Sequence, residues 1–512
     1  MSEPASRSSE PLDQLKTHLA EAADLQSAAA VLSWDQETFM PEGGAAARSR
    51  QLSTLQRLAH DAFTRDDVGA LLEELAPQVE GEDPLASDDA ALVRVARRDY
   101  ERKRKLSSDL VARLAQASSE AKEAWKAARA DDDFDAFAPH LRRLVDLNRE
   151  KADALGYGSG EEATPYDALL DEYEPGARTA DVAPLFEQLR DDLVPLVDAI
   201  SDAEPIDDAC LRGAFAPDAQ QAAGEEVIRA FGYDFQRGRQ DRSAHPFTTA
   251  FSTGDVRLTT RFDPQFFGTG FFATLHEAGH GLYEQGVADD LERTPLAEGA
   301  SLGLHESQSR LWENLVGRSR AFWRGYFPTL TEHFPQQLSD VSGNAFYRAV
   351  NKVEPSLIRV EADEVTYNLH VMLRFEIERA LIEDRLAVDD LPERWNAAMD
   401  DYLGVTPSSD ADGVLQDVHW PMGAFGYFPT YTLGTLMSVQ LFRQARADLG
   451  DLDEQIAQGR FTPLLKWLRE HIHRHGRKLQ AADLLERVTG ETLSAEPWMN
   501  YAREKFGALY DI

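Results

Sequence analysis

The stretch LHEAGHGL, residues 275–282, places two histidines and a glutamate where a metal site would need them. His276 and His280 are four residues apart, so on an α-helix both side chains lie on one face and can converge on one point. Glu277 follows about 100° around the helix, beside that point, where a carboxylate suits the general base of a hydrolase. The spacing predicts a zinc site, and the alternative is a pair of histidines in an ordinary core helix.

A hydrolytic zinc site needs a third protein ligand and an open position for water. The segment LGLHESQSRLWENLVG, residues 302–317, follows HEAGH and offers two candidates in an apolar setting. Glu306 is the favoured ligand and His305 competes with it, while a plain surface position for Glu306 is the alternative. The residues alone leave this choice open.

The elements that must position these residues are mostly helical. Apolar residues recur every three or four positions over residues 11–75 and 90–155, and again through the second half of the chain. Residues 254–264, GDVRLTTRFDP, alternate and are rich in β-branched side chains, which predicts a strand paired with the preceding AHPFTTAF, residues 244–251. No shift in composition divides the chain, so we expect a single domain over residues 1–512.

The charge of the chain excludes several classes of partner. Its 512 residues include 89 Asp and Glu against 53 Lys and Arg, a formal net charge of −36. Such a surface repels nucleic acid and anionic lipid, so we expect neither as a partner, and it suits a salt-rich cytoplasm that screens the repulsion. The single cysteine, Cys210, and a polar N-terminus without a signal pattern favour a cytoplasmic location.

One segment has the length of a membrane span. Residues 423–442 carry no charge, but Pro429 and three glycines dilute their apolar character. We therefore expect a buried loop and helix there, and no membrane association.

Six spaced motifs make the chain resemble the carboxypeptidase Taq family of metallocarboxypeptidases over nearly its full length. In chain order they are HPF (His245–Phe247), DxRxT (Asp255, Arg257 and Thr259), HEAGH (His276–His280), HESQ (His305–Gln308), IRxxAD (Ile358–Asp363) and GxxQDxHW (Gly413–Trp420). The segments WDQETFMP, residues 34–41, and GYFPTY, residues 426–431, also resemble the family. Six motifs in this order are far more specific than HExxH alone.

The resemblance implies a mainly helical fold of the neurolysin-like HExxH architecture, with a small β-sheet at the wall of a deep active-site cleft. Within the single domain we expect residues 1–10 to be disordered, 11–235 to form the helical cleft wall and lid, 236–265 the small sheet, and 266–512 the helical catalytic region. The strand predicted within residues 236–265 would offer its edge to an extended peptide through main-chain hydrogen bonds. Such bonds do not depend on side chains, in keeping with broad specificity.

The resemblance also implies a homodimer that binds one Zn²⁺ per subunit, with Co²⁺ as the alternative. It selects Glu306 over His305 as the third metal ligand. The implied activity is hydrolysis of the C-terminal peptide bond, in which Glu277 takes a proton from water and passes it to the leaving amine.

The oxyanion that forms during such a reaction needs hydrogen-bond donors. His419, together with Tyr427 or Tyr431, supplies the candidates, although aromatic residues in an apolar run more often belong to the core. Asp417 would orient His419 or simply cap a turn.

Peptides with a free C-terminus are the expected substrates, and their carboxylate needs an arginine in so acidic a protein. Arg359 matches the IRxxAD position that the resemblance places at the substrate terminus, with Glu361 and Asp363 to hold its guanidinium. The alternative is that Arg359 only pairs with those carboxylates. Arg257 is the second candidate cation, and His245 joins it in the substrate-binding set.

Two other functions stay open at this point. An endopeptidase would share HExxH and Glu306 with a carboxypeptidase. A catalytically silent peptide-binding protein would keep the cleft but would have no use for Glu277.

Overall fold

The computed structural model describes residues 10–158, 160 and 162–512. The segment predicted to be disordered, residues 1–10, lies outside the described residues except for Glu10, where α1 begins. The helices are α1 Glu10–Thr38, α2 Ala45–Phe63, α3 Asp66–Leu75, α4 Asp88–Lys105, α5 Ser108–Asp131, α6 Phe134–Leu155, α7 Pro165–Tyr173, α8 Thr179–Ser201, α9 Pro217–Phe231, α10 Phe267–Glu284, α11 Leu302–Arg310, α12 Arg320–His333, α13 Pro335–Leu338, α14 Gly343–Val350, α15 Thr366–Ile382, α16 Leu391–Leu403, α17 Pro429–Leu449, α18 Leu452–Ala457, α19 Thr462–His471, α20 Ala481–Thr489 and α21 Glu496–Tyr510. The mainly helical fold predicted from the periodicity is confirmed.

Local sequence explains where a helix begins, what it buries and where it ends, as α6 illustrates. The carboxylate of Asp133 caps the helix by accepting a hydrogen bond from a first-turn amide at 3.1 Å. Phe137, Leu141 and Leu144 follow at spacings of four and three and are all buried. Gly156, with a φ of 76°, ends the helix in a conformation that other residues rarely adopt.

A three-stranded sheet consists of β1 Gly238–Arg242, β2 Phe247–Ser252 and β3 Asp255–Thr260. β3 lies in the centre, parallel to β1 and antiparallel to β2, so the predicted strand and its pairing with the preceding segment are confirmed. Alternation along β3 buries Val256 and Leu258, and Leu258 packs against Gly281 of α10. Asp255 and Arg257 lie on the opposite face.

The prediction that β3 offers a free edge to a substrate is wrong. β3 is hydrogen-bonded on both sides, because β1 pairs with it along the edge that β2 leaves open. β2 is an outer strand of the sheet, and its Thr248 contacts Glu277 of α10. β2 is therefore the strand that lies next to Glu277.

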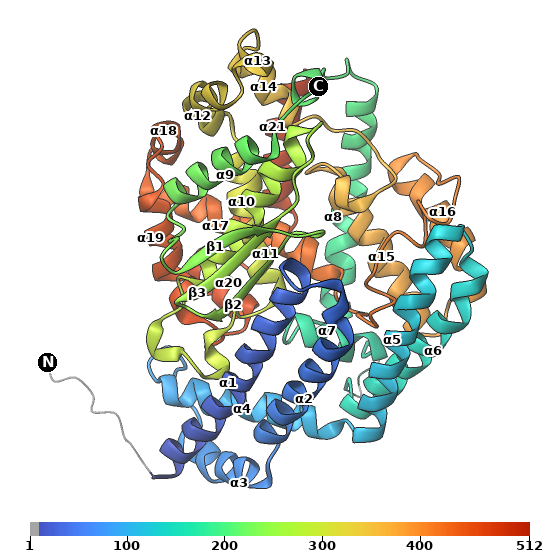
Figure 1. Ribbon diagram of the computed structural model, residues 1–512, viewed down its shortest axis with the longest axis vertical. Helices are drawn as coiled ribbons and strands as arrows, with labels where there is room; N and C mark the ends of the chain where they lie inside the picture. Colours follow the sequence, from blue (N-terminus) through green and yellow to red (C-terminus); the bar gives the residue numbers. More distant parts are fainter. Residues whose placement is uncertain (1–9, 159, 161) are drawn as a thin grey trace, which may run out of the picture.

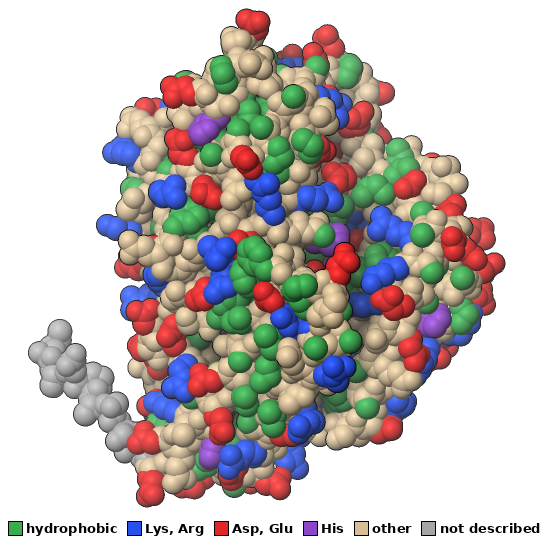
Figure 2. Space-filling view, viewed as in Figure 1, with side chains coloured by type: hydrophobic (Ala, Val, Ile, Leu, Met, Phe, Trp, Pro, Cys, Tyr) green, Lys and Arg blue, Asp and Glu red, His purple; other side chains and the backbone are tan. Residues whose placement is uncertain are grey.

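The sheet lies against α10 near the middle of the molecule, with α1 to α4 packed below it (Figure 1). Helices α5, α6, α15 and α16 form a lobe on the right in the same view. The space-filling view shows the surface hollowed between that lobe and the part that carries the sheet (Figure 2). Acidic and basic side chains are interspersed over the face in view.

Buried apolar side chains form one continuous cluster that extends from Leu12 to Tyr510. The uncharged segment 423–442 forms a loop followed by the first two thirds of α17, whose side chains are mostly buried in this cluster. Among the described residues, none of the helices has the length and apolar character needed to cross a bilayer.

Candidate metal centre and active site

α10 carries both histidines of HEAGH and packs tightly against α11. Leu275, Ala278 and Leu282 bury one side of α10 in the core. On another side Gly279 meets α11 so closely that a Cβ there would lie 2.5 Å from the Cα of Ser309. The glycine of HEAGH therefore allows the close contact that brings α11 to the two histidines.

Glu306 of α11 completes the predicted set of ligands. Its Oε2 atom lies 3.5 Å from Nε2 of His276 and 3.4 Å from Nε2 of His280. One ligand atom from each of the three residues lies within 4.8 Å of the other two. On the far side, a Cβ on Gly434 of α17 would lie 2.7 Å from the Cβ of Glu306, so α11 is held between two helices. The structure thus brings the three predicted ligands to one point.

The outer atoms of these side chains are already bonded, which directs the inner atoms toward the common point. His276 donates from Nδ1 to Oε2 of Glu313 at 2.9 Å, and Oε1 of Glu306 accepts from Nε of Arg310 at 2.7 Å. Arg310 and Arg318 each reach a different oxygen of Glu313 at 3.3 Å. Two imidazole nitrogens and one carboxylate oxygen are the donor set of a catalytic zinc site, so the residues fit such an ion.

His305, the competing ligand, is engaged elsewhere. Its Nδ1 atom lies 2.5 Å from Nδ1 of His280, and its Nε2 atom lies 2.6 Å from Oε1 of Glu284. Both ring nitrogens therefore contact protein groups, and neither belongs to the set that converges with Glu306.

Burial and neighbouring charges give the ligands different pKa values. Burial lowers the pKa of His280 to about 3, with a further contribution from His305. Burial would also lower the pKa of His276, but Glu306 and Glu313 outweigh it and raise that pKa. The pKa of Glu306 lies well below its usual range, because the charges of Arg310 and His276 overcome the effect of burial. Glu306 is therefore ionised, which is the form that binds a cation.

Glu277 lies beside the ligands and is held by the sheet. Its side chain is buried, and Oε2 accepts a hydrogen bond from Oγ1 of Thr248 in β2 at 2.7 Å. Burial raises the pKa of Glu277, which makes its carboxylate a stronger base than an exposed one. Sequence reasoning missed Thr248, for which the hydroxyl-rich strand FTTAFS was the available signal.

A second buried cluster surrounds Arg359. Asp417 accepts hydrogen bonds from Nε and Nη2 of Arg359 at 3.1 and 2.7 Å, and from Nε of Arg374 at 2.6 Å. Nη1 of Arg359 donates to the hydroxyl of Tyr367 at 2.8 Å. The two arginines hold the pKa of Asp417 far below its usual range, although burial acts in the opposite direction.

The predicted partners of Arg359 are wrong. Glu361 is exposed and its nearest cation is Arg261, at 3.7 Å. Asp363 instead accepts hydrogen bonds from the backbone and hydroxyl of Thr366, so it caps α15. The carboxylate that pairs with Arg359 is Asp417, which lies in a loop 58 residues further along the chain.

His419 borders this cluster with the two tyrosines of GYFPTY. Its Nε2 atom lies 3.2 Å from the hydroxyl of Tyr431, while its Nδ1 atom is 3.9 Å from Asp417, too far for a hydrogen bond. Asp417 thus neither orients His419 nor caps a turn. Burial lowers the pKa of His419 to about 3. Burial also raises the pKa of Tyr427 to about 12, with a contribution from the charge of Glu306, which places this phenol near the metal ligands.

The cluster around Arg359 has polar atoms without hydrogen-bond partners among the described residues. They are Nη2 of Arg374, both ring nitrogens of His370 and Nδ1 of His419. Arg374 and His370 are fully buried. Two arginines face one aspartate here, so the cluster carries positive charge in excess.

Arg257 and His245 have contacts of their own in the sheet and the loop before it. Arg257 donates from Nε and Nη2 to Asp255 at 2.8 Å and stacks over the ring of Trp34, 4.2 Å from its centre. This contact gives the WDQETFMP segment a structural part, because Trp34 joins α1 to the sheet. His245 is exposed in the loop before β2 and meets the sheet through its carbonyl group.

Glu378 of α15 is a buried carboxylate that the sequence did not single out. It accepts hydrogen bonds from Tyr166 at 2.7 Å, from Nε1 of Trp420 at 2.9 Å and from the amide of Gly426 at 3.0 Å. Two of these donors belong to QDVHW and GYFPTY, so Glu378 fixes both segments. No motif or spacing in the sequence marks this role.

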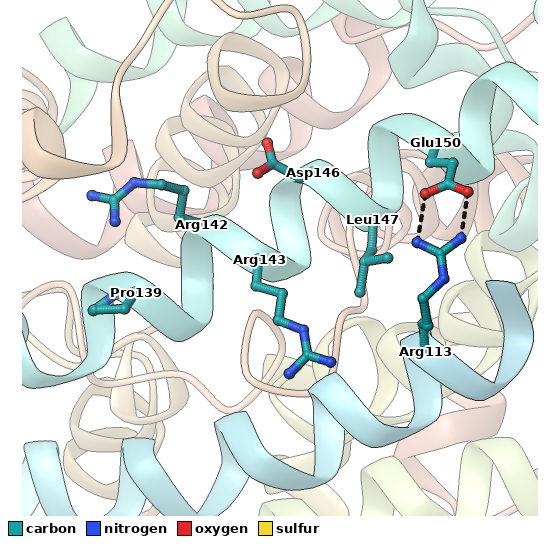
Figure 3. Close-up of a pocket in the computed structure, with 7 residues that line it drawn as sticks. All are labelled: Arg113, Pro139, Arg142, Arg143, Asp146, Leu147 and Glu150. Carbon is teal, nitrogen blue, oxygen red and sulfur yellow. Dashed lines mark hydrogen bonds and ion pairs between the residues drawn. The ribbon is translucent and has the colours of Figure 1, made fainter. Parts of the chain in front are cut away.

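A surface pocket between α5 and α6 is unrelated to this site. Figure 3 shows Arg113, Arg142, Arg143 and Glu150 around it, and a pair of hydrogen bonds joins Arg113 to Glu150. Arg142 and Arg143 point away from each other in this view and pair with carboxylates of their own. None of the residues that line the pocket belongs to either cluster.

The fold is mainly helical, and the site carries the donor set of a metal-dependent hydrolase. The sequence profile of the carboxypeptidase Taq (M32) metallopeptidase family matches residues 14–506. The chain is 48% identical over 497 residues to thermostable carboxypeptidase 1 of Thermus thermophilus, covering 96% of this chain and 97% of that one. It is 38% identical over 484 residues to carboxypeptidase 1 of Bacillus subtilis, covering 94% and 95%.

Solved structures agree with these relatives. The M32 carboxypeptidase from Deinococcus radiodurans superposes with a TM-score of 0.95 at 43% identity, covering 98% of this chain and 100% of that one. The Pyrococcus furiosus carboxypeptidase gives a TM-score of 0.93 at 38% identity, covering 98% and 99%. The chain belongs to the carboxypeptidase Taq (M32) metallopeptidase family, and it is therefore a metal-dependent hydrolase of peptide bonds.

Proposed function

We propose that the protein is a zinc-dependent carboxypeptidase of broad specificity, in which Glu277 is the general base. The observation that carries the proposal is the convergence of His276, His280 and Glu306, whose ligand atoms lie within 4.8 Å of one another. Glu277 lies next in sequence to one of these ligands and is held by Thr248 at 2.7 Å.

The proposed chemistry divides between the ion and the protein. Bound zinc supplies Lewis acidity toward the scissile carbonyl and toward a water molecule. The carboxylate of Glu277 takes the proton of the attacking water and delivers it to the leaving amine. Burial raises its pKa, which favours acceptance of that proton.

Donors for the developing oxyanion come from Tyr427, Tyr431 and His419, and the charge of Glu306 acts on both tyrosines. The hydroxyl groups of Tyr427 and Tyr431 and the neutral imidazole of His419 each carry one proton to donate. The raised pKa values of both tyrosines keep their hydroxyl groups protonated, as donation requires.

Substrate orientation involves two further elements. The outer strand β2 can pair with an extended peptide through main-chain groups, which read no side chain and so allow broad specificity. Arg359 is the proposed reader of the α-carboxylate, because its guanidinium lies in a cluster with excess positive charge. Arg257 is neutralised by Asp255, so Arg359 is the better candidate.

Mass spectrometry of peptide digestion tests the proposal directly. Zinc-loaded protein should trim a free peptide stepwise from its C-terminus and should cleave the C-terminally amidated peptide poorly. Internal cleavage of both peptides would instead establish an endopeptidase, and absence of cleavage would favour a peptide-binding protein.

The role of Glu277 has its own test. In Glu277→Gln, kcat should fall by about 100-fold to 10,000-fold while zinc content stays at one per chain. Glu486→Gln, which alters an exposed carboxylate on α20, should match the native protein. Native activity in zinc-loaded Glu277→Gln would remove Glu277 from the mechanism.

A further inference from the structure

His305 of the HESQ motif lies between a metal ligand and a carboxylate. Its Nδ1 atom is 2.5 Å from Nδ1 of His280, and its Nε2 atom is 2.6 Å from Oε1 of Glu284. The rings of His305 and His280 are nearly parallel, with an angle of 24° and centres 4.6 Å apart. The ring of Tyr283 also packs against His305, with ring centres 5.2 Å apart. The imidazole is therefore fixed by contacts at both nitrogens and by a ring.

The direction of these hydrogen bonds follows from the chemistry of the groups. A carboxylate oxygen accepts, so the 2.6 Å contact with Oε1 of Glu284 places the proton of His305 on Nε2. With that proton on Nε2, Nδ1 of His305 accepts a hydrogen bond from the Nδ1–H group of His280. Proton placement on Nδ1 leaves the lone pair of His280 on Nε2, the atom that faces Glu306 at 3.4 Å.

We propose that His305 and Glu284 are positioning residues that fix the tautomer and ring orientation of His280 for metal binding. This inference rests on the proposed metal-dependent function. It assigns HESQ a second part beside the ligand Glu306, because the preceding histidine supports the ligand on the neighbouring helix.

The geometry of α10 supports the assignment. Glu284 follows His280 by four residues, so both side chains lie on one face of α10 and His305 bridges them from α11. The side chains of His280, His305 and Glu284 are all more than four-fifths buried, which limits competition from solvent. His276 has a different support, since it donates directly to Glu313, whose charge Arg310 and Arg318 share.

We call the series of contacts from Glu284 through His305 to His280 the relay. Zinc affinity, measured by competition with a chromophoric chelator, tests it. Because removal of such outer partners costs about 10-fold to 100-fold in metal affinity, Glu284→Leu and His305→Leu should bind zinc more weakly by that factor. Glu284→Gln keeps an acceptor for His305 and should lose less. His305→Asn should recover part of the loss, since its Oδ1 replaces the Nδ1 acceptor that faces His280. Glu486→Gln is the matched control.

The Co²⁺ absorption spectrum is a second readout that a merely structural role would not change. With Co²⁺ bound at saturation, the visible bands should shift in His305→Leu and Glu284→Leu and stay unchanged in Glu486→Gln. Native zinc affinity and a native cobalt spectrum in both leucine variants would overturn the relay. Equal losses in all four relay variants, without the graded order, would also overturn it.

These experiments distinguish a failure of the relay from a failure of the proposed function. Native protein that bound no divalent metal would refute the zinc enzyme itself, and the relay with it. Native protein that bound zinc, with leucine variants that bound it equally well, would refute the relay alone. The isosteric Glu284→Gln and His305→Asn variants keep the test decisive if a leucine variant fails to fold.

Discussion

Two buried polar clusters lie close together in this molecule and are built in opposite ways. Around His276, His280 and Glu306, the outer atoms are bonded to protein groups and the inner atoms converge. Around Arg359 and Arg374, two cations share one aspartate, and several buried donors have no partner among the described residues. The first arrangement suits a cation, and the second suits an anion.

Tyr367 connects the two clusters. Its hydroxyl group accepts from Arg359 at 2.8 Å, and the guanidinium of Arg310, the partner of Glu306, lies 4.3 Å from the centre of its ring. Arg310, the partner of the proposed ligand Glu306, and Arg359, the proposed reader of the α-carboxylate, therefore contact the same side chain. This pairing accounts for a peptidase that acts at a chain end.

The largest expected effect comes from breaking the convergent cluster. His276→Ala or His280→Ala should lose zinc and bring peptidase activity to background, because two protein ligands do not hold a catalytic zinc ion. Metal analysis after dialysis, with circular dichroism as the check on folding, measures this outcome. Full zinc content in either variant would show that the convergence does not hold a metal.

The second largest effect is expected from Arg359→Ala, which should impair recognition of the substrate terminus and leave the metal site intact. One charge-assisted hydrogen bond contributes about 1.5 to 3 kcal/mol, so Arg359→Ala should reduce kcat/KM for free peptides by about 10-fold to 100-fold. Zinc content should stay native, and the slow cleavage of amidated peptides should change little. Equal slowing of both kinds of peptide would mean that Arg359 does not read the terminus.

The pH dependence of stability tests whether Glu378, which contacts Trp420 and Gly426, has a raised pKa in the folded protein. Burial raises the pKa of Glu378 to about 7, so the protonated form stabilises the fold below the ordinary pKa of 4.5. This stabilisation is lost as pH rises from 4.5 toward 7, by up to about 3 kcal/mol. Glu378→Gln should remove that part of the decline.

Denaturant unfolding at pH 5 and at pH 7.5 measures this difference between native protein and Glu378→Gln. Glu174, another buried carboxylate whose pKa burial raises to about 7, is present in both proteins and cancels. Identical pH dependence in the two proteins would show that Glu378 stays ionised in the folded state.

The smallest expected effect is that of salt on the melting temperature. Salt screens the exposed charges of the surface more than the charges of the two buried clusters. With 89 acidic against 53 basic side chains, the folded protein repels itself at low ionic strength. Molar KCl should raise Tm by about 2 °C or more, the shift that about 1 kcal/mol produces in a large domain. A Tm independent of salt would remove the high-salt interpretation, without bearing on either cluster.

Patterns local to a helix or strand allowed much of this architecture to be predicted. The four-residue spacing of His276 and His280 required only that the segment be helical, which α10 is. The alternation of residues 254–264 likewise predicted β3. Glu306 was different, because the neighbouring His305 competed with it as a ligand, and the family resemblance decided between the two residues.

Contacts between distant loops could not be predicted in this way. The partner of Arg359 was sought among near neighbours, but Asp417 reaches it from 58 residues away, at a position that depends on the packing of α15 and the loop before α17. Thr248 meets Glu277 because β2 lies against α10, and no spacing in the sequence specifies that contact. Glu378 is hidden for the same reason.

Both ring nitrogens of His276 contact side chains from one short segment, residues 306–313. Nε2 of His276 faces Glu306, and Nδ1 donates to Glu313, seven residues later. The chain passes from α11 into a π-helical turn over residues 311–317, so one residue inserted between these glutamates would turn one of them away from the ring by roughly a quarter of a turn. We therefore expect relatives of this protein to differ in length at surface turns such as residues 80–87 and to keep the number of residues between Glu306 and Glu313 constant.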